Sequence, residues 1–197
     1  MDSNKRGKRA GRVRIIAGQW RSRVIEVPAH PDLRPTPDRV RETLFNWLGQ
    51  HLEGCTCLDL YAGSGALGFE AASRGAARVV MVESDRAVFE ALRRNRERLG
   101  AETVEVLGQD ALAYLARAGE RFDVVFLDPP FRQNVLPGLL AKLTARLRPG
   151  ARVYVEAPDA MQVAAPWREL KRARAGQVSY QLLQWSDDDP SGVSGDV

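Results

Sequence analysis

Between residues 55 and 156, short apolar runs alternate with longer segments in which apolar residues recur every three or four positions. The apolar runs predict strands at 55–61, 78–83, 103–107, 122–127 and 151–156. The segments with helical periodicity predict helices at 65–74, 85–99, 109–118 and 135–147. Because apolar strands that alternate with helices form parallel sheets with helices on both faces, the pattern predicts an α/β fold.

Both ends of the chain depart from this alternation. Two β-prone runs predict an N-terminal hairpin that turns at Gly18-Gln19: 12-RVRIIAG-18 and 20-WRSRVIEV-27. Two more predict a C-terminal hairpin that turns at Gly176: 167–176 and 177–185. An antiparallel hairpin that closes a parallel sheet is typical of S-adenosylmethionine methyltransferases and distinguishes their sheet from that of the dehydrogenases.

The sequence also indicates where individual helices begin and end. Thr36 is a good N-cap and Pro37 a good first residue for a helix that we expect to reach about Gln50. Asp85 and Gly100 are expected to start and stop the helix at 85–99 in the same way.

At 197 residues the chain fits one domain with short additions. We expect a basic flexible arm at 1–11, the N-terminal hairpin at 12–27, the α/β domain at 28–185 and an acidic flexible tail at 186–197.

The net charge is only +4, but basic residues crowd the N-terminal segment. Eight lie within the first 23 residues: Lys5, Arg6, Lys8, Arg9, Arg12, Arg14, Arg21 and Arg23. Such a cluster is either a solvated arm or an electrostatic footprint for nucleic acid. Because the charges continue into the patterned hairpin, we favour nucleic acid as the partner.

The cysteines and histidines make a metal site improbable. Cys55 and Cys57 are too close in sequence to form a comfortable disulfide, and with His30 and His51 they offer a poor set of zinc ligands. We therefore expect no metal and a reduced, cytoplasmic protein. The chain shows no long apolar run and no hydrophobic segment behind its first residues, so we expect neither a membrane span nor a secretory signal.

The first predicted strand leads into the glycine-rich segment 58-LDLYAGSGALG-68. Its G-x-G-x-x-G pattern, with Glu83 about twenty residues further on, is compatible with a dinucleotide such as NAD. Asp59 favours another ligand, because a carboxylate there opposes a pyrophosphate but attracts an ammonium or a sulfonium. The segment 108-GQDA-111, after the third strand, offers amide and carboxylate groups for an adenine amino group.

The segment 127-LDPPF-131 follows a very apolar strand and places an acid at its end. Two prolines beside that acid remove backbone donors and stiffen the chain, so Asp128 and the Pro129 carbonyl form a corner that contains only acceptors. Such a corner can hold both hydrogens of an exocyclic amine while Phe131 stacks on the base. The alternative is an ordinary turn after a strand, with Phe131 filling a gap.

Together with 12-RVRIIAGQWRSR-23, 34-RPTPDRVRETLFNWL-48, 58-LDLYAGSGALGFEAASRGA-76 and 176-GQVSYQLLQW-185, this corner resembles the RsmD family of 16S ribosomal RNA guanine-N2 methyltransferases. The resemblance covers about residues 12–185, and the R-P-T-x-D-R-V-R-E-T-L-F-N segment is its most specific part. It implies a class I, Rossmann-like methyltransferase with a mixed sheet and an N-terminal β-hairpin. It further implies S-adenosylmethionine as cofactor and N2-methylguanine in the small-subunit rRNA as product.

The resemblance also implies site residues. Those expected to bind the cofactor are Asp59, Tyr61, Gly63, Gly65, Glu83, Ser84, Gln109, Asp110 and Ala111. Among them, Glu83 is expected to hold the ribose hydroxyls and Asp110 the adenine amino group. The expected catalytic residues are Asp128, Pro129, Pro130 and Phe131. From the cluster of basic charge, and not from the resemblance, the residues expected to contact RNA are Arg12, Arg14, Trp20, Arg21, Arg23, Arg34 and Arg39, with Trp20 equally compatible with a place in the core. The basic stretch continues to Arg41, and some of Arg34, Arg39 and Arg41 are also compatible with ordinary ion pairs on the helix surface.

The expected partner is 16S rRNA, within the small ribosomal subunit or an assembly intermediate, and we expect the protein to be a monomer. Three other functions stay open: an adenine-N6 or other amino-group methyltransferase acting on nucleic acid, a non-catalytic RNA-binding protein with a methyltransferase fold, and an NAD dehydrogenase.

Overall fold

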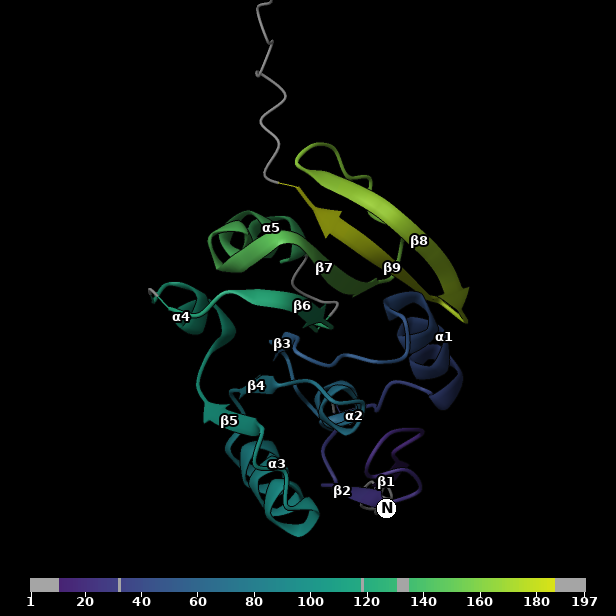
Figure 1. The fold of residues 1–197 in the computed structure, drawn as a ribbon, viewed down its shortest axis with the longest axis vertical. Helices are drawn as coiled ribbons and strands as arrows, with labels where there is room; N and C mark the ends of the chain where they lie inside the picture. The colour runs from purple at the N-terminus through teal and green to yellow at the C-terminus, as the bar shows by residue number, and fades with distance from the viewer. Residues whose placement is uncertain (1–10, 32, 118, 131–134, 187–197) are drawn as a thin grey trace, which may run out of the picture.

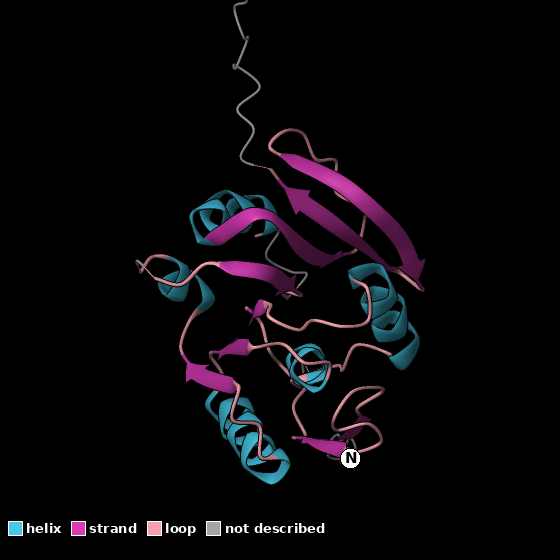
Figure 2. Cartoon of the chain, in the orientation of Figure 1, coloured by secondary structure: helices cyan, strands magenta, loops and turns pink. Residues whose placement is uncertain are grey.

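The computed structural model describes residues 11–31, 33–117, 119–130 and 135–186 and contains two sheets. A two-stranded antiparallel sheet is formed by β1 (Gly11–Arg14) and β2 (Val24–Val27). A seven-stranded sheet has the order β5-β4-β3-β6-β7-β9-β8 (Figures 1 and 2). Its strands are β3 (Thr56–Asp59), β4 (Arg78–Glu83), β5 (Val104–Gly108), β6 (Phe122–Leu127), β7 (Leu147–Ala157), β8 (Trp167–Ala175) and β9 (Val178–Trp185).

The order and direction of the strands agree with the α/β architecture that the sequence predicts. The chain enters the sheet at β3, builds outward to β5, and returns to the other side of β3 with β6. The first five strands are parallel, whereas β9 pairs antiparallel with both β7 and β8. The predicted fold class, with its C-terminal antiparallel hairpin, is confirmed. In open α/β sheets ligands bind at the carboxyl ends of the strands where the order reverses, here between β3 and β6.

Helices cover both faces of the large sheet (Figure 1). They are α1 (Asp38–Leu48), α2 (Ala66–Ser73), α3 (Arg86–Leu99), α4 (Ala111–Leu115) and α5 (Leu136–Leu143). Because side chains alternate along a strand, Cys57 packs in one core with α1, α2 and α3, while Leu58 packs in a second core with α4 and α5. None of the helices in the described ranges is long and apolar enough to cross a membrane.

Some element boundaries differ from the predicted ones. Helix α1 begins at Asp38, so Pro37 occupies the N-cap and Thr36 makes no capping bond. Helix α5 ends at Leu143, and a 3₁₀ turn at Thr144–Arg146 leads directly into β7. The buried Arg146 explains this ending, because its guanidinium donates to the carbonyls of Tyr114, Arg117 and Glu120 and ties the turn to the connection before β6.

The N-terminal hairpin differs from its prediction more than the helices do. A ladder joins Gly11–Arg14 to Val24–Val27, and residues 15–23 form a long loop in place of a tight turn at Gly18-Gln19. Helix α2 holds this loop: the Gln19 N–H donates to the Ser73 carbonyl, and the Trp20 N–H donates to Ser73 Oγ. A Cβ atom on Gly18 would lie 1.8 Å from the Ser73 oxygen, so only glycine permits this approach.

Parts of the predicted terminal segments lie outside the described residues. Of the expected arm at 1–11 the structure describes residue 11 alone, and of the expected tail at 186–197 it describes residue 186 alone.

Candidate active site

The carboxyl ends of β3 to β6 bring four acidic residues to one edge of the sheet, which we call the carboxyl edge. Asp59 and Glu83 are the last residues of β3 and β4, Asp110 follows β5, and Asp128 follows β6. Sequence reasoning expected these four residues to share a site, and the parallel arrangement of the strands places them at the same edge.

Asp59 occupies the position that an anion would take at the start of α2. Its side chain is only 3 % exposed, and Oδ2 accepts a hydrogen bond of 3.0 Å from the Gly68 N–H in the first turn of the helix. A Cβ atom on Gly68 would lie 2.3 Å from Met81 Cε, which explains the third glycine of the motif. Since a carboxylate already neutralises this helix terminus, the turn is poorly suited to a pyrophosphate.

The Asp59 carboxyl also has an unusual proton affinity. Burial raises its pKa to about 7, against the lowering effect of the Gly68 hydrogen bond and with a further contribution from the charge of Glu83. A nearby positive charge would favour the ionised form and lower this pKa. The site therefore suits a ligand that carries a sulfonium and an ammonium, as S-adenosylmethionine does.

Glu83 is held as an acceptor beside the glycine turn. Oε2 accepts from the Gly63 N–H at 3.0 Å, and Oε1 accepts from the Asp85 N–H at 2.7 Å. These two bonds fix the carboxylate, and each oxygen keeps a lone pair for a hydroxyl donor. The arrangement fits the predicted role of Glu83 in holding ribose hydroxyls.

The residues predicted to surround the adenine lie next to Glu83. Asp110 is exposed and caps α4 by accepting from the Ala113 N–H at 2.9 Å. Burial, followed by the charge of Asp110, raises the pKa of the half-buried Tyr61, so these two side chains belong to the same surroundings. The Gln109 N–H donates to the Glu83 carbonyl and joins the ends of β4 and β5. The structure brings the predicted cofactor residues together, and their individual roles stay predictions.

The predicted catalytic corner directly follows β6. Asp128 is partly buried, Pro129 is buried and Pro130 is exposed, while Phe131 lies outside the described residues. Burial raises the pKa of Asp128 well above its usual range, and the charges of Glu156 and Asp59 raise it further. Both charges are negative, so Asp128 lies in acidic surroundings.

Glu156 is a residue of this site that sequence reasoning missed. It belongs to β7, is 7 % exposed, and accepts a hydrogen bond of 2.7 Å on Oε1 from the hydroxyl of Tyr154. Burial raises its pKa, while the bond from Tyr154 has the opposite effect. The signal that could have identified it is an acid inside an apolar strand, the same signal that identified Asp59.

The residues predicted to contact RNA divide into two groups. Five are exposed and make no side-chain hydrogen bond or ion pair within the described parts of the chain: Arg12, Arg14, Arg21, Arg34 and Arg39. Arg23 is also exposed, but its guanidinium donates to the carbonyls of Arg98 and Leu99 and thereby attaches the loop to the end of α3.

For two residues of this region the structure favours the alternative to RNA contact that the sequence had left open. The Trp20 side chain is 5 % exposed and packs in the core beside α2, so it is not available to stack on RNA. Arg41 is fully buried and pairs with Glu70 at 3.3 Å and with Asp38 at 2.7 Å, so it stabilises the fold and does not extend the basic surface.

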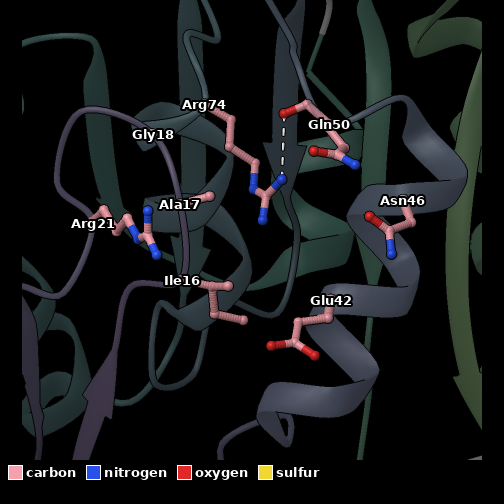
Figure 3. A pocket seen from close by; sticks show the side chains of 8 residues that line it. All are labelled: Ile16, Ala17, Gly18, Arg21, Glu42, Asn46, Gln50 and Arg74. Carbon is pink, nitrogen blue, oxygen red and sulfur yellow. Dashed lines mark hydrogen bonds between the residues drawn. The ribbon is translucent and has the colours of Figure 1, made fainter.

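A cavity of about 570 Å³ lies between the N-terminal loop and α1. Figure 3 shows Glu42, Asn46 and Gln50 on the α1 side and Arg21 on the loop side. Arg74 forms the third side, where its Nη1 donates to the Gln50 carbonyl at 3.3 Å. The cavity is separate from the carboxyl edge, since none of its lining residues lies at a strand end, and it extends the polar surface of the hairpin.

Comparisons with known proteins agree with this geometry. A family model described as "Conserved hypothetical protein 95" matches residues 13–184. "Ribosomal RNA small subunit methyltransferase D" of Escherichia coli (strain K12) is 45% identical over 180 residues, covering 89% of this chain and 91% of that protein. The protein of the same name from Haemophilus influenzae is 44% identical, covering 88% and 94%.

A solved structure shows the same fold. That of yhhF from Escherichia coli has a TM-score of 0.81 and 45% sequence identity, covering 89% of this chain and 99% of that chain. These findings confirm the resemblance stated from the sequence motifs. The chain therefore belongs to the conserved hypothetical protein 95 family, which includes the ribosomal RNA small subunit methyltransferase D proteins, and it is an S-adenosylmethionine-dependent methyltransferase.

Proposed function

We propose that the protein transfers the methyl group of S-adenosylmethionine to the exocyclic N2 of a guanine in 16S rRNA. The observation that carries this proposal is the acceptor-only corner Asp128-Pro129-Pro130 at the same sheet edge as Asp59, Glu83 and Asp110. The relatives named as small-subunit rRNA methyltransferases support the choice of RNA.

The corner works by holding the amine. We assign to the Asp128 carboxylate and the Pro129 carbonyl the two hydrogens of the guanine amino group, which turns the nitrogen lone pair away from both acceptors. The bound cofactor supplies an electrophilic methyl group on a positively charged sulfur. Fixing a nucleophile and an electrophile in this way can lower a barrier by about 7–11 kcal/mol. Phe131 is proposed to stack on the base.

The thiols take no part in this scheme. Burial raises the pKa of Cys57, and burial followed by the charge of Asp123 raises that of Cys55, so both are poor nucleophiles at neutral pH. Neither lies at the carboxyl edge. We therefore propose direct transfer to the amine without a covalent enzyme intermediate.

The exposed arginines of the hairpin and of the segment before α1 are proposed to bind RNA phosphates. One of them, Arg21, also lines the cavity beside α1. The target guanine must leave its stack at a cost of a few kcal/mol, which favours a loop of the rRNA. We propose that the substrate is the small ribosomal subunit or an assembly intermediate, and that the protein acts as a monomer in the cytoplasm.

The product identifies the function directly. Purified protein is incubated with S-adenosylmethionine labelled in its methyl group and with small ribosomal subunits that lack the modification, and the rRNA is digested to nucleosides. We expect the label in N2-methylguanosine. Label in N6-methyladenosine would replace the proposed substrate atom with an adenine amine, and an absence of label in every nucleoside would refute the proposal.

The affinity for the cofactor should depend on pH through Asp59. Its pKa of about 7 in the free protein falls when a positive charge binds nearby, so the ionised form binds the cofactor more tightly. We expect the Kd for S-adenosylmethionine to decrease about five- to tenfold between pH 5.5 and 8 and to level off above that, since one unit of pKa corresponds to a factor of ten. Isothermal titration calorimetry across this range measures the change.

Two controls make this result specific. Asp59→Asn keeps an acceptor for the Gly68 N–H but removes the titrating group, so its Kd should not vary with pH in this range. S-adenosylhomocysteine lacks the sulfonium charge, so its Kd should vary less. A cofactor affinity that stays constant with pH in the unmodified protein would contradict the assignment of Asp59.

A further inference from the structure

We propose that Glu156 is a positioning residue that acts through Asp128: the two carboxyl groups share one proton and together accept the proton that the methylated amine releases. This inference rests on the proposed role of Asp128 in holding the amine. It concerns a residue on a different strand, outside the motif that carries the proposed function.

The register of β6 and β7 makes the two carboxyl groups neighbours. These strands are parallel and pair Leu127 with Val155, so Asp128 and Glu156 are each one residue beyond the last matched pair. Adjacent strands lie about 4.8 Å apart. Because side chains alternate along a strand, both residues follow Phe126 and Tyr154 on the sheet face that also carries Asp59.

The described side chains that surround Glu156 on this side are two tyrosines and a tryptophan, and none of them carries a positive charge. Tyr154 donates its hydroxyl hydrogen to Oε1, and Tyr180 on β9 is the register partner of Glu156. Trp47 of α1 stacks on Tyr180 at a centroid distance of 5.3 Å and covers this side. The titratable groups that face the pair are therefore Asp59 from β3, Tyr154 from β7 and Tyr180 from β9. In the described part of the chain no lysine or arginine forms an ion pair with either carboxyl.

Two ionised carboxylates in such a place repel each other, and burial disfavours both charges. Removal from water raises the pKa of both groups, and the charge of Glu156 raises that of Asp128 further. In the proposed state the pair therefore holds one proton and one negative charge. The two groups then titrate as a unit, as coupled carboxyl groups do.

The singly charged carboxyl pair can accept the proton that the methylated amine releases. The amine nitrogen forms a bond to the methyl carbon, and the electron pair of the broken sulfur–carbon bond stays on sulfur. The nitrogen then carries one proton too many, which passes to the singly charged pair and leaves both carboxyl groups neutral until a proton is lost to solvent. An acceptor must be ionised to take up a proton, and sharing the remaining proton with Glu156 stabilises the ionised form of Asp128.

Glu156→Gln tests the pair. Glutamine has the same length and keeps an oxygen for the Tyr154 hydroxyl, but it cannot carry the negative charge. Single-turnover methylation rates are measured from pH 5.5 to 9 with saturating S-adenosylmethionine and small ribosomal subunits that lack the modification. We expect the acid limb of the profile to move to higher pH by about one unit, because glutamine has no acidic proton to share with the Asp128 carboxylate and the singly charged state becomes less stable. The plateau rate should fall about three- to tenfold, with the Kd for the cofactor within about twofold.

Two comparison variants separate this effect from a structural one. Glu156→Asp keeps a carboxyl group and should return the acid limb toward its original position. Glu102→Gln removes an exposed carboxylate that precedes β5, at the opposite end of that strand from the carboxyl edge, and it should leave the limb in place. An acid limb that stays unmoved in Glu156→Gln overturns the pair.

The outcome for Glu156 is distinguishable from the outcome for the proposed function. If the unmodified protein places no label in N2-methylguanosine, the proposed function fails. If the unmodified protein forms N2-methylguanosine and Glu156→Gln has an unmoved acid limb, only the pair fails. Should Glu156→Gln not fold, carbon-13 NMR of carboxyl-labelled wild-type protein decides. One neutral carboxyl group at the pair at pH 7 supports the inference, and two ionised groups overturn it.

Discussion

Replacing Asp128 with alanine is expected to lower the single-turnover rate of methylation by about 10²–10⁴-fold, the range found when a positioned proton acceptor is removed. Asp128 supplies the side-chain acceptor of the corner after β6, and its prolines offer no N–H that could take over. The Kd for S-adenosylmethionine should stay within a few-fold, because the predicted cofactor contacts lie on β3, β4 and β5. Rapid quenching measures the rate, and calorimetry measures the affinity.

A matched variant separates orientation from proton transfer in this experiment. Asp128→Asn keeps an oxygen that can accept a hydrogen from the amine but is no base, so its rate should lie between those of the wild type and Asp128→Ala. Near-normal turnover of Asp128→Ala would remove the corner from the mechanism and leave the fold assignment intact.

Replacing Glu70 with glutamine is expected to destabilise the protein by about 3–5 kcal/mol, the usual cost of breaking a buried ion pair. Glu70 is fully buried, and four donors point at its carboxylate. Oε1 accepts from the Ala17 N–H at 3.0 Å and from Arg74 Nε at 2.8 Å. Oε2 accepts from the Ile16 N–H at 2.8 Å and from Arg41 Nη1 at 3.3 Å.

The large effect follows from the burial of the partners. Both guanidinium groups would lose their buried counter-charge, and Arg41 Nε already lacks a hydrogen-bond partner among the described residues. The N-terminal loop (residues 15–23) would also lose one of the two backbone hydrogen bonds that Glu70 accepts from Ile16 and Ala17, because glutamine keeps only one side-chain oxygen. We therefore expect weaker binding of rRNA as well as a lower free energy of unfolding, measured by urea denaturation followed by circular dichroism.

An exposed ion pair provides the control for Glu70. Arg78 pairs with Glu105, and each side chain is almost half exposed, so Glu105→Gln should cost less than about 1 kcal/mol. A similarly small cost for Glu70→Gln would show that the cluster around Glu70 does not hold the loop.

Most of the carboxyl edge could be predicted from the sequence because its residues are marked by local features. Glu83, Asp110 and Asp128 each stand at or just beyond the end of an apolar run, and Asp59 stands inside one, just before the glycine turn. In a parallel sheet all such ends meet at one edge, so the alternation of strands and helices is sufficient to group these residues. The glycine turn could be assigned in the same way, since the acid before it and the glycines within it are separated by only a few positions.

Contacts between distant segments were decided by the tertiary structure. Trp20 and Arg41 look like surface residues within a basic stretch, and only the packing of the loop and α1 against α2 shows that they are buried. The tight turn expected at Gly18-Gln19 gives way to a loop because its backbone donors find Glu70 and Ser73, more than 50 residues further along the chain.

At the active site, the position of Glu156 likewise could not be predicted from the sequence alone. Its place beside Asp128 depends on the register between β6 and β7, which no local pattern specifies. The sequence by itself therefore determined the order of the elements, the acids at their ends and the family. The tertiary structure decided which arginines stay exposed and which carboxyl group lies beside Asp128, because both depend on which segments pack together and not on the residues within any one segment.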